Sequence, residues 1–211
     1  MTIHAIETRL YLEYFTHLVQ GDVPSCVRLV RMLLDESVPL QTVYLDLLQP
    51  ALYEVGDRWS CGNLSVGVEH LASASTAQVM RQIYDRVAGA ALTGQTAMIA
   101  CIANEYHQIG GRMVADLLEQ RGWRVAFLGA NTPQTDMLDL VAQLRPDLLG
   151  LSVTLPENLS AVRQAASAAR ERFADLPIVV GGQAFALAGE DLSLDHLPNV
   201  RQLGSVHPLL E

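Results

Sequence analysis

The sequence predicts an α/β protein of two domains, an N-terminal four-helix bundle over residues 1–90 and a doubly wound parallel sheet over residues 95–211. Three observations support this prediction. Apolar residues recur at helical spacing through the first 90 positions. A stretch of small residues, 88–94, then marks a linker. Beyond it, short apolar runs alternate with helical stretches, which is the order that builds a parallel sheet covered by helices.

Four amphipathic helices joined by short turns account for the first domain. They are predicted over residues 6–18, 26–33, 39–59 and 65–83. Gly21 and Asp22 break the first helix from the second, and Pro39 suits the first turn of the third. Pro50 predicts a kink inside the third helix, because proline has no N–H to donate. Helices of this kind pack as a bundle.

Alternating strands and helices account for the second domain. The strands are predicted over residues 98–103, 124–128, 148–153 and 178–180. The helices between them are predicted over residues 109–120, 133–144 and 159–173. Thr132 is expected to cap the second of these helices, with Pro133 at its first position. In such sheets a ligand binds beyond the carboxyl ends of the strands.

Composition narrows the class of function. Fourteen basic against twenty-three acidic residues give a net charge of −9, and no run of basic residues forms a footprint for phosphates. Direct binding to DNA or RNA is therefore not expected. No apolar stretch reaches the roughly 20 residues that a membrane span requires. We therefore expect a cytoplasmic protein that does not cross a membrane.

Cysteine and histidine spacing argues against two common kinds of site. The three cysteines, Cys26, Cys61 and Cys101, are scattered and odd in number, which favours neither a disulfide framework nor a thiolate metal site. The six histidines form no H-E-x-x-H pair, so a zinc enzyme of that type has no support.

The segment Glu105–Gly110, which reads E-Y-H-Q-I-G, lies where the first strand of the second domain gives way to a helix. It places His107 at the carboxyl end of a parallel sheet. Glu105, two residues earlier, can orient the imidazole, and Gly110 leaves room for a bulky group. This arrangement is suited to presenting one metal ligand to a large cofactor.

Two further strand ends carry polar or small residues. Ser152-Val153-Thr154 ends the third strand, and Gly181-Gly182 follows the fourth. Because parallel strands present their carboxyl ends on one edge, we expect these residues to converge with His107. The spacing lacks G-x-G-x-x-G, so a dinucleotide is a poor candidate.

These segments resemble a known family. A D/E-x-H-x-x-G turn, an S-x-T pair and a Gly-Gly pair, in a Rossmann-like (flavodoxin-like) domain behind a four-helix bundle, are similar to the cobalamin-binding module of methionine synthase, corrinoid methyl-transfer proteins and CarH-type photoreceptors. The resemblance implies that His107 replaces dimethylbenzimidazole as the lower axial ligand of cobalt, oriented by Glu105. It also implies a groove for the nucleotide tail, walled by Gly110, Ser152, Thr154, Gly181 and Gly182. The adjoining residues assigned to the same cofactor site are Gln108, Ile109, Leu155 and Gln183.

A motif in the bundle favours one branch of this family. Residues 59–70 contain W-x-x-G-x-L-S-V-x-x-E-H, which is similar to the sequence that caps the upper face of cobalamin in CarH-like light sensors. The resemblance implies that Trp59 packs where the adenosyl group sits, with Val66, Glu69 and His70 close by. It implies adenosylcobalamin as cofactor and light sensing, rather than an enzymatic activity, as function.

Two departures from CarH affect the expected output. CarH begins with a DNA-binding helix-turn-helix, whereas here the bundle begins almost at Met1, so the signal is expected to pass through a downstream protein or a homo-oligomer. In CarH a histidine follows the tryptophan and ligates cobalt after photolysis; here that position is Ser60, which leaves the upper ligand open. Photocobilins, standalone relatives that pair cobalamin with a bilin, add a bilin to the candidate cofactors.

Simpler interpretations stand beside each of these. A corrinoid shuttle of a methyltransferase system and a plain cobalamin carrier are the alternative functions. His107 alone could be a polar loop residue, and Trp59 a core aromatic of the bundle. Glu69 and His70 could be solvated surface residues. Hydroxyls at a strand end and paired glycines also occur in ordinary turns.

Overall fold

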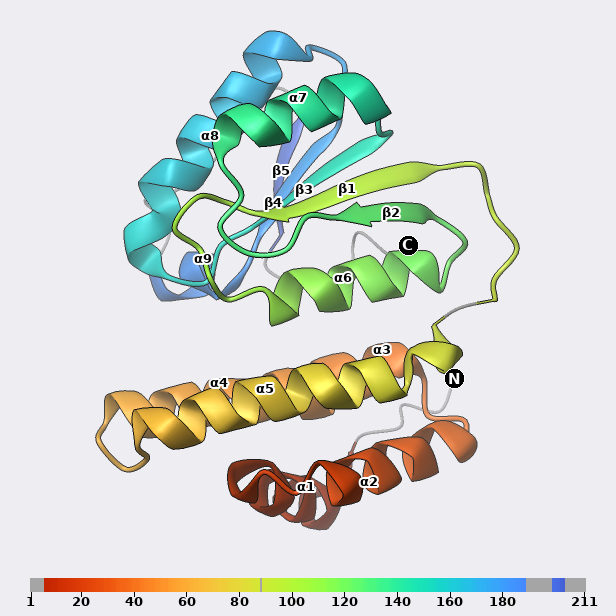
Figure 1. Cartoon of the computed structure of the whole chain (residues 1–211), viewed down its shortest axis with the longest axis vertical. Helices are drawn as coiled ribbons and strands as arrows, with labels where there is room; N and C mark the ends of the chain where they lie inside the picture. Colours follow the sequence, from red (N-terminus) through yellow and green to blue (C-terminus); the bar gives the residue numbers. More distant parts are fainter. Residues whose placement is uncertain (1–5, 88, 189–198, 204–211) are drawn as a thin grey trace. The chain divides into compact units, whose positions relative to one another are not determined.

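The computed structural model describes residues 6–87, 89–188 and 199–203, so the predicted domain ends at residues 1–5 and 204–211 lie outside the described residues. The chain divides into two compact units, Met1–Gly89 and Ala90–Glu211 (Figure 1). Each unit is described by itself. Among the described residues, no helix has the length and apolar character to cross a membrane.

The first unit is the expected helical bundle. Its elements are α1 (Thr8–Gln20), α2 (Val23–Asp35), α3 (Leu40–Val43), the π-helix η1 (Tyr44–Leu48), α4 (Gln49–Ser60), α5 (Val66–Gln82) and the 3₁₀ turn η2 (Tyr84–Arg86). Their apolar faces meet in a core that includes Tyr14, Leu18, Val30, Leu47 and Val55. The helical spacing of these residues places them on one face of each helix. Their burial confirms the prediction that amphipathic helices pack together.

Local signals set the ends of these helices. Gly21 adopts a left-handed conformation (φ 70°) and its N–H bonds to the carbonyls of His17 and Leu18, which ends α1. Ser65 accepts a hydrogen bond from the N–H of Val68 and begins α5. Pro50 lies in the first turn of α4, and the π-helical segment η1 ends two residues before it, so helical backbone continues from α3 through α4.

The second unit is a five-stranded parallel sheet. Its strands are β1 (Thr96–Cys101), β2 (Arg124–Phe127), β3 (Leu148–Ser152), β4 (Ile178–Gly181) and β5 (Val200–Leu203). Their spatial order is β2-β1-β3-β4-β5. The remaining elements are α6 (Ile109–Glu119), α7 (Gln134–Leu144), the 3₁₀ turn η3 (Pro156–Asn158), α8 (Leu159–Arg172) and α9 (Gln183–Ala188).

Helices cover both faces of this sheet, as the doubly wound prediction requires (Figure 1). On one face, Ala97 and Ile99 of β1 pack against Ala115 and Leu118 of α6. On the other face, apolar residues of β1, β3 and β4 pack with α7, α8 and α9 in the larger core. Burial on both faces explains why the strands are continuous apolar runs.

Some boundaries and one cap differ from the predictions. β5 and α9 were not predicted, and β1 ends at Cys101, two residues before the predicted end of this strand. Thr132 does not cap α7: Pro133 holds the N-cap position without a side-chain hydrogen bond. Thr132 instead forms a β-bridge with Ile102, and its buried hydroxyl has no hydrogen-bond partner among the described residues. Because Thr132 pairs with Ile102, the helix begins two residues later, at Gln134.

Candidate functional site

The carboxyl ends of β1, β3 and β4 meet in register. Cys101 pairs with Ser152, and Ser152 pairs with Gly181, so the three strand ends that the sequence singled out are neighbours. Gly111, near the start of α6, lies over this edge. A Cβ there would stand 3.4 Å from Sγ of Cys101 and 3.5 Å from Cβ of Ser152, so glycine allows the helix to approach the strand ends closely. Gly110, the glycine of the motif, has no such neighbour.

Glu105 is the centre of this edge. Its side chain is 0% exposed. Oε1 accepts hydrogen bonds from the backbone N–H of His107 (3.0 Å) and from Nδ1 of the same residue (2.6 Å). Oε2 accepts bonds from the backbone N–H groups of Thr154 (2.8 Å) and Leu155 (3.2 Å) and from Nδ2 of Asn158 (3.2 Å). A buried carboxylate is tolerated here because both oxygens are fully used by donors.

These donors keep Glu105 ionised. Burial by itself would raise the pKa of this carboxyl group, but the hydrogen bonds from His107, Thr154 and Leu155 outweigh burial and lower the pKa from 4.5 to about 2. At neutral pH the side chain is therefore a carboxylate that can only accept hydrogen bonds.

This charge state fixes the tautomer of His107. Because the carboxylate of Glu105 accepts only, Nδ1 must carry the hydrogen of their 2.6 Å contact, and Nε2 is the basic nitrogen. The side chain of His107 is 47% exposed while its partner is buried. A carboxylate bound to one ring nitrogen orients the imidazole and raises the basicity of the other nitrogen, as in metal centres with histidine ligands.

Three asparagines join the loops around Glu105, and the sequence reasoning missed all of them. Asn104 follows β1, Asn131 follows β2 and Asn158 ends η3. Nδ2 of Asn158 contacts both Glu105 and the carbonyl of Asn104, while Oδ1 of Asn131 accepts the N–H of Asn104. The available signal was residue type, since asparagine is enriched in left-handed turns, where Asn104 and Asn131 lie.

The other predicted residues lie around the same strand ends. Thr154 and Leu155 contact Glu105 through their backbone N–H groups. Ile109 is the first residue of α6 and Gln183 the first of α9. Gln108 precedes α6, and its Oε1 lies 3.2 Å from where a Cβ on Gly129 would stand.

Gly182 has a structural role that the sequence did not reveal. Its φ is 128°, which side chains rarely adopt, and a Cβ there would stand 2.0 Å from the carbonyl oxygen of Val153. The close approach that requires glycine is thus to the chain's own backbone. Gly181, the last residue of β4, is half-buried beside Ser152.

The predicted residues of the bundle lie at one helical hairpin. Trp59 is near the end of α4 and is 47% exposed, so it is not a core residue of the bundle. Val66, the first residue of α5, is 50% exposed. One turn into α5, Glu69 accepts hydrogen bonds from Nδ1 of His70 (2.6 Å) and from Oγ of Ser73 (2.9 Å).

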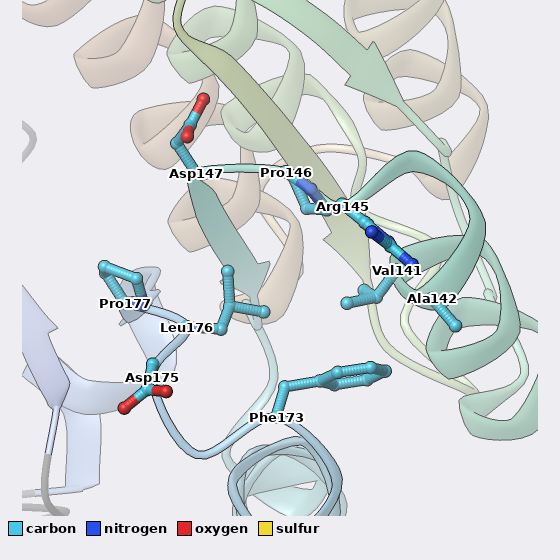
Figure 2. Close-up of a pocket in the computed structure, with 9 residues that line it drawn as sticks. All are labelled: Val141, Ala142, Arg145, Pro146, Asp147, Phe173, Asp175, Leu176 and Pro177. Atoms are coloured by element: carbon cyan, nitrogen blue, oxygen red, sulfur yellow. The ribbon is translucent and has the colours of Figure 1, made fainter.

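A surface cavity of about 580 Å³ lies at the opposite edge of the sheet (Figure 2). Figure 2 shows side chains from the ends of α7 and α8 and from the segments that precede β3 and β4. The lining residues are Val141, Ala142, Arg145, Pro146, Asp147, Phe173, Asp175, Leu176 and Pro177. None of the predicted site residues lines it, and ligands of such sheets bind at the carboxyl edge.

The residues at the carboxyl edge fit a cofactor whose metal takes one protein ligand. They offer one imidazole held by an ionised, buried carboxylate. No atom lies within 4 Å of where a Cβ on Gly110 would stand, so there is open space beside this loop. The comparison with known families defines the class of this protein, a cobalamin-binding module. Residues 95–200, just over half of the chain, match the B12 binding domain, and residues 11–84 match a second family with the same description. The chain belongs to the B12-binding-domain family, and its module is CarH-like.

Two relatives and one solved structure define the neighbourhood. The chain is 38% identical over 160 residues to the HTH-type transcriptional repressor CarA of Myxococcus xanthus. The aligned region covers 72% of this chain and 52% of CarA. The chain is 33% identical over 151 residues to CarH of the same organism, covering 70% and 49%. The chain thus spans about half the length of each repressor. The monomethylamine corrinoid protein of Methanosarcina barkeri shares the fold, with a TM-score of 0.80, 14% identity and 97% of each chain covered.

Proposed function

We propose that this chain is a light sensor that binds adenosylcobalamin with His107 as the lower axial ligand of cobalt. The observation that carries the proposal is the 2.6 Å contact between Nδ1 of His107 and Oε1 of Glu105, because it makes Nε2 the basic nitrogen of a half-exposed ring. The adenosyl form of the cofactor supplies a cobalt–carbon bond that light cleaves.

The exposed indole of the bundle supports a sensor more than a methyl carrier. A methyl-transfer protein needs an open upper face so that partner enzymes reach the metal, and a bulky aromatic side chain opposes such access. In the proposal Trp59 contacts the adenosyl group, so that loss of this group changes the surroundings of the indole and shifts the conformational population of the bundle. The similarity to CarA and CarH supports the same branch.

We propose His70 as the residue that contacts cobalt from above after illumination, because Ser60 occupies the sequence position at which CarH has its ligating histidine. Nδ1 of His70 bonds to Glu69 at 2.6 Å, which leaves Nε2 as the basic nitrogen of a side chain that is 75% exposed. The pairing repeats the one between Glu105 and His107. A His70→Ala variant is expected to keep the dark spectrum and to change the spectrum after illumination; an unaltered lit spectrum would remove His70 from the proposal.

We further propose that the signal leaves this chain through self-association and a downstream protein. The net charge of −9 opposes direct contact between this chain and DNA. Exposed apolar side chains on the bundle, Leu12 and Met32 among them, are suited to contacts between proteins. Size-exclusion chromatography of the loaded protein, dark and illuminated, tests the self-association: an unchanged elution volume would contradict it.

The deciding experiment is spectroscopic. The protein is loaded with adenosylcobalamin in the dark, and its visible spectrum is recorded before and after blue-green light. We expect a base-off, histidine-on spectrum that changes on illumination; His107→Ala should lose the histidine-on signature, and His17→Ala, in the bundle, should keep it. A spectrum that light does not alter would refute the sensor and leave cobalamin binding intact. A bilin, the second chromophore considered, would add a band at red wavelengths.

A corrinoid shuttle for a methyltransferase is the alternative, because the fold is shared with the monomethylamine corrinoid protein. Fold alone does not decide function. A shuttle would accept a methyl group on its reduced cofactor from a partner enzyme, and Trp59 is expected to hinder this transfer. If wild type exchanges methyl groups as fast as Trp59→Ala, the shuttle is favoured; if neither light nor methyl donors act on the protein, it is a plain carrier.

A further inference from the structure

The loop that carries Glu105 and His107 is held by a neighbouring loop through Asn131. This residue lies between β2 and α7 and contacts the ligand loop at two points. Its Oδ1 accepts the backbone N–H of Asn104 (2.8 Å), and its own backbone N–H donates to the carbonyl of Glu105 (2.8 Å). The peptide group before Asn104 and the peptide group after Glu105 are therefore both hydrogen-bonded to one residue, which lies 27 positions after Asn104 in the sequence.

Asn104 and Asn131 both have a left-handed backbone conformation, which hydrogen bonds can stabilise. Asn104 has φ of 66° and Asn131 has φ of 50°, in the left-handed region that costs most side chains free energy. Asparagine tolerates this region because its short polar side chain can bond locally. Here the side chain of Asn131 bonds to the other left-handed residue, so the two turns stabilise each other.

The contact made by Asn131 differs from the one made by Asn158. Asn158 reaches the carboxylate of Glu105 directly. Asn131 instead holds the main chain on which that carboxylate is mounted, immediately before the side chain enters the buried position. The direction of the carboxylate, and with it the direction of the imidazole two residues later, depends on this main chain.

We infer that Asn131 is a positioning residue for the cobalt ligand: it acts through Glu105 to hold the imidazole of His107 in its ligating orientation. The inference rests on the proposed ligation of cobalt by His107. It assigns to the loop after β2 a part in metal binding that is separate from any contact with the cofactor. A single hydrogen bond of this kind is expected to change the proportion of histidine-ligated cofactor by about two- to tenfold.

Two substitutions separate the side-chain contact from backbone strain. Asn131→Gly removes the Oδ1 acceptor and allows the left-handed φ, so any loss reflects the missing hydrogen bond. Asn131→Asp keeps an oxygen that accepts the N–H of Asn104. Asn199→Gly is the matched control, because Asn199 is also left-handed (φ 57°) but precedes β5, at the opposite edge of the sheet.

The test uses the full chain and two measurements. In the loaded protein, the visible spectrum gives the histidine-on fraction as the pH is lowered. In the cofactor-free protein, nitrogen NMR of the imidazole gives the tautomer of His107. We expect Asn131→Gly to lose the histidine-on form at a higher pH than wild type and to mix the tautomers, while Asn131→Asp and Asn199→Gly follow wild type.

Three outcomes would overturn the inference. These are a wild-type result for Asn131→Gly in both measurements, an equal loss in Asn131→Asp, and an equal loss in Asn199→Gly. The proposed ligation is judged separately, by His107→Ala. If that variant keeps the wild-type spectrum, cobalt ligation by His107 fails, and the tautomer in the cofactor-free protein still decides whether Asn131 positions the ring.

Discussion

Replacing Glu105 by glutamine removes a charge and one acceptor from the most connected side chain of the site. Oε1 accepts two hydrogen bonds and Oε2 accepts three, whereas a glutamine offers one oxygen and directs an NH₂ group at the remaining donors. With the NH₂ group on the Oε1 side, the least crowded choice, Nδ1 of His107 must give up its hydrogen and accept. Nε2 then carries the hydrogen and cannot bind a metal.

The magnitude follows from the pKa of Glu105. Its lowering from 4.5 to about 2 corresponds to about 3 kcal/mol of folding free energy at neutral pH. Because the folded pKa lies below the unfolded value, this stability is present above pH 4.5 and is lost as the pH falls toward 2. We expect Glu105→Gln to lose about 3 kcal/mol at pH 7 and to weaken cobalamin binding by about 10- to 100-fold.

The assays are urea denaturation of the cofactor-free protein and absorbance titration with cobalamin. Glu105→Asp keeps the charge and is expected to fall between wild type and Glu105→Gln in both. Glu157→Gln, the same change on an exposed side chain beside Asn158, is the matched control and should follow wild type. Glu105→Gln with wild-type urea midpoint and wild-type histidine-on spectrum would refute the reasoning about this carboxylate.

Further predictions concern stability and exposure. Gly182→Ala is expected to cost about 3 kcal/mol or more in urea denaturation, because its Cβ would meet the carbonyl of Val153 at 2.0 Å; a cost below 1 kcal/mol would contradict the described turn. Hydrogen bonds from Thr96 lower the pKa of Asp147, so the folding stability that these bonds contribute is present above pH 3.8 and is lost as the pH falls below it. The difference in unfolding free energy between Asp147→Asn and wild type should therefore shrink as the pH falls. A difference that does not change with pH would contradict this. Cys61 is exposed, whereas Cys26 and Cys101 are buried, so a maleimide should label Cys61 alone. Bound adenosylcobalamin should slow that labelling in the dark and light should restore it; labelling that ignores the cofactor would argue against a cofactor contact at the Trp59 hairpin.

Most of the fold could be predicted because its signals are local. The change from helical spacing to short apolar runs near residue 92 reflects how each unit buries its core, and it survives in any single stretch of sequence. β5, with Val200 and Leu203 as its apolar residues, and the six-residue α9 are too short to show a period. The cap predicted at Thr132 was wrong because Thr132 pairs instead with Ile102, a residue far from it in the sequence.

The site was predictable to the level of its segments and no further. Parallel strands bring Cys101, Ser152 and Gly181 to one edge, so strand ends with unusual residues had to meet. Which groups face Glu105 could not be read in this way. Thr154 contributes its N–H rather than its hydroxyl, and Asn158 reaches Glu105 across 53 positions of sequence, because backbone direction in the loops decides both contacts.

The most direct test of the account is the identity of the nitrogen bound to cobalt. The protein is labelled with ¹⁵N in histidine, loaded with unlabelled cobalamin and reduced to the paramagnetic cobalt(II) form, and its electron paramagnetic resonance spectrum is recorded. Ligation by His107 predicts two-line splitting from ¹⁵N, which reverts to three lines in unlabelled protein and is lost in His107→Ala. Three-line splitting in the labelled protein would mean that cobalt keeps its benzimidazole, and would contradict the account.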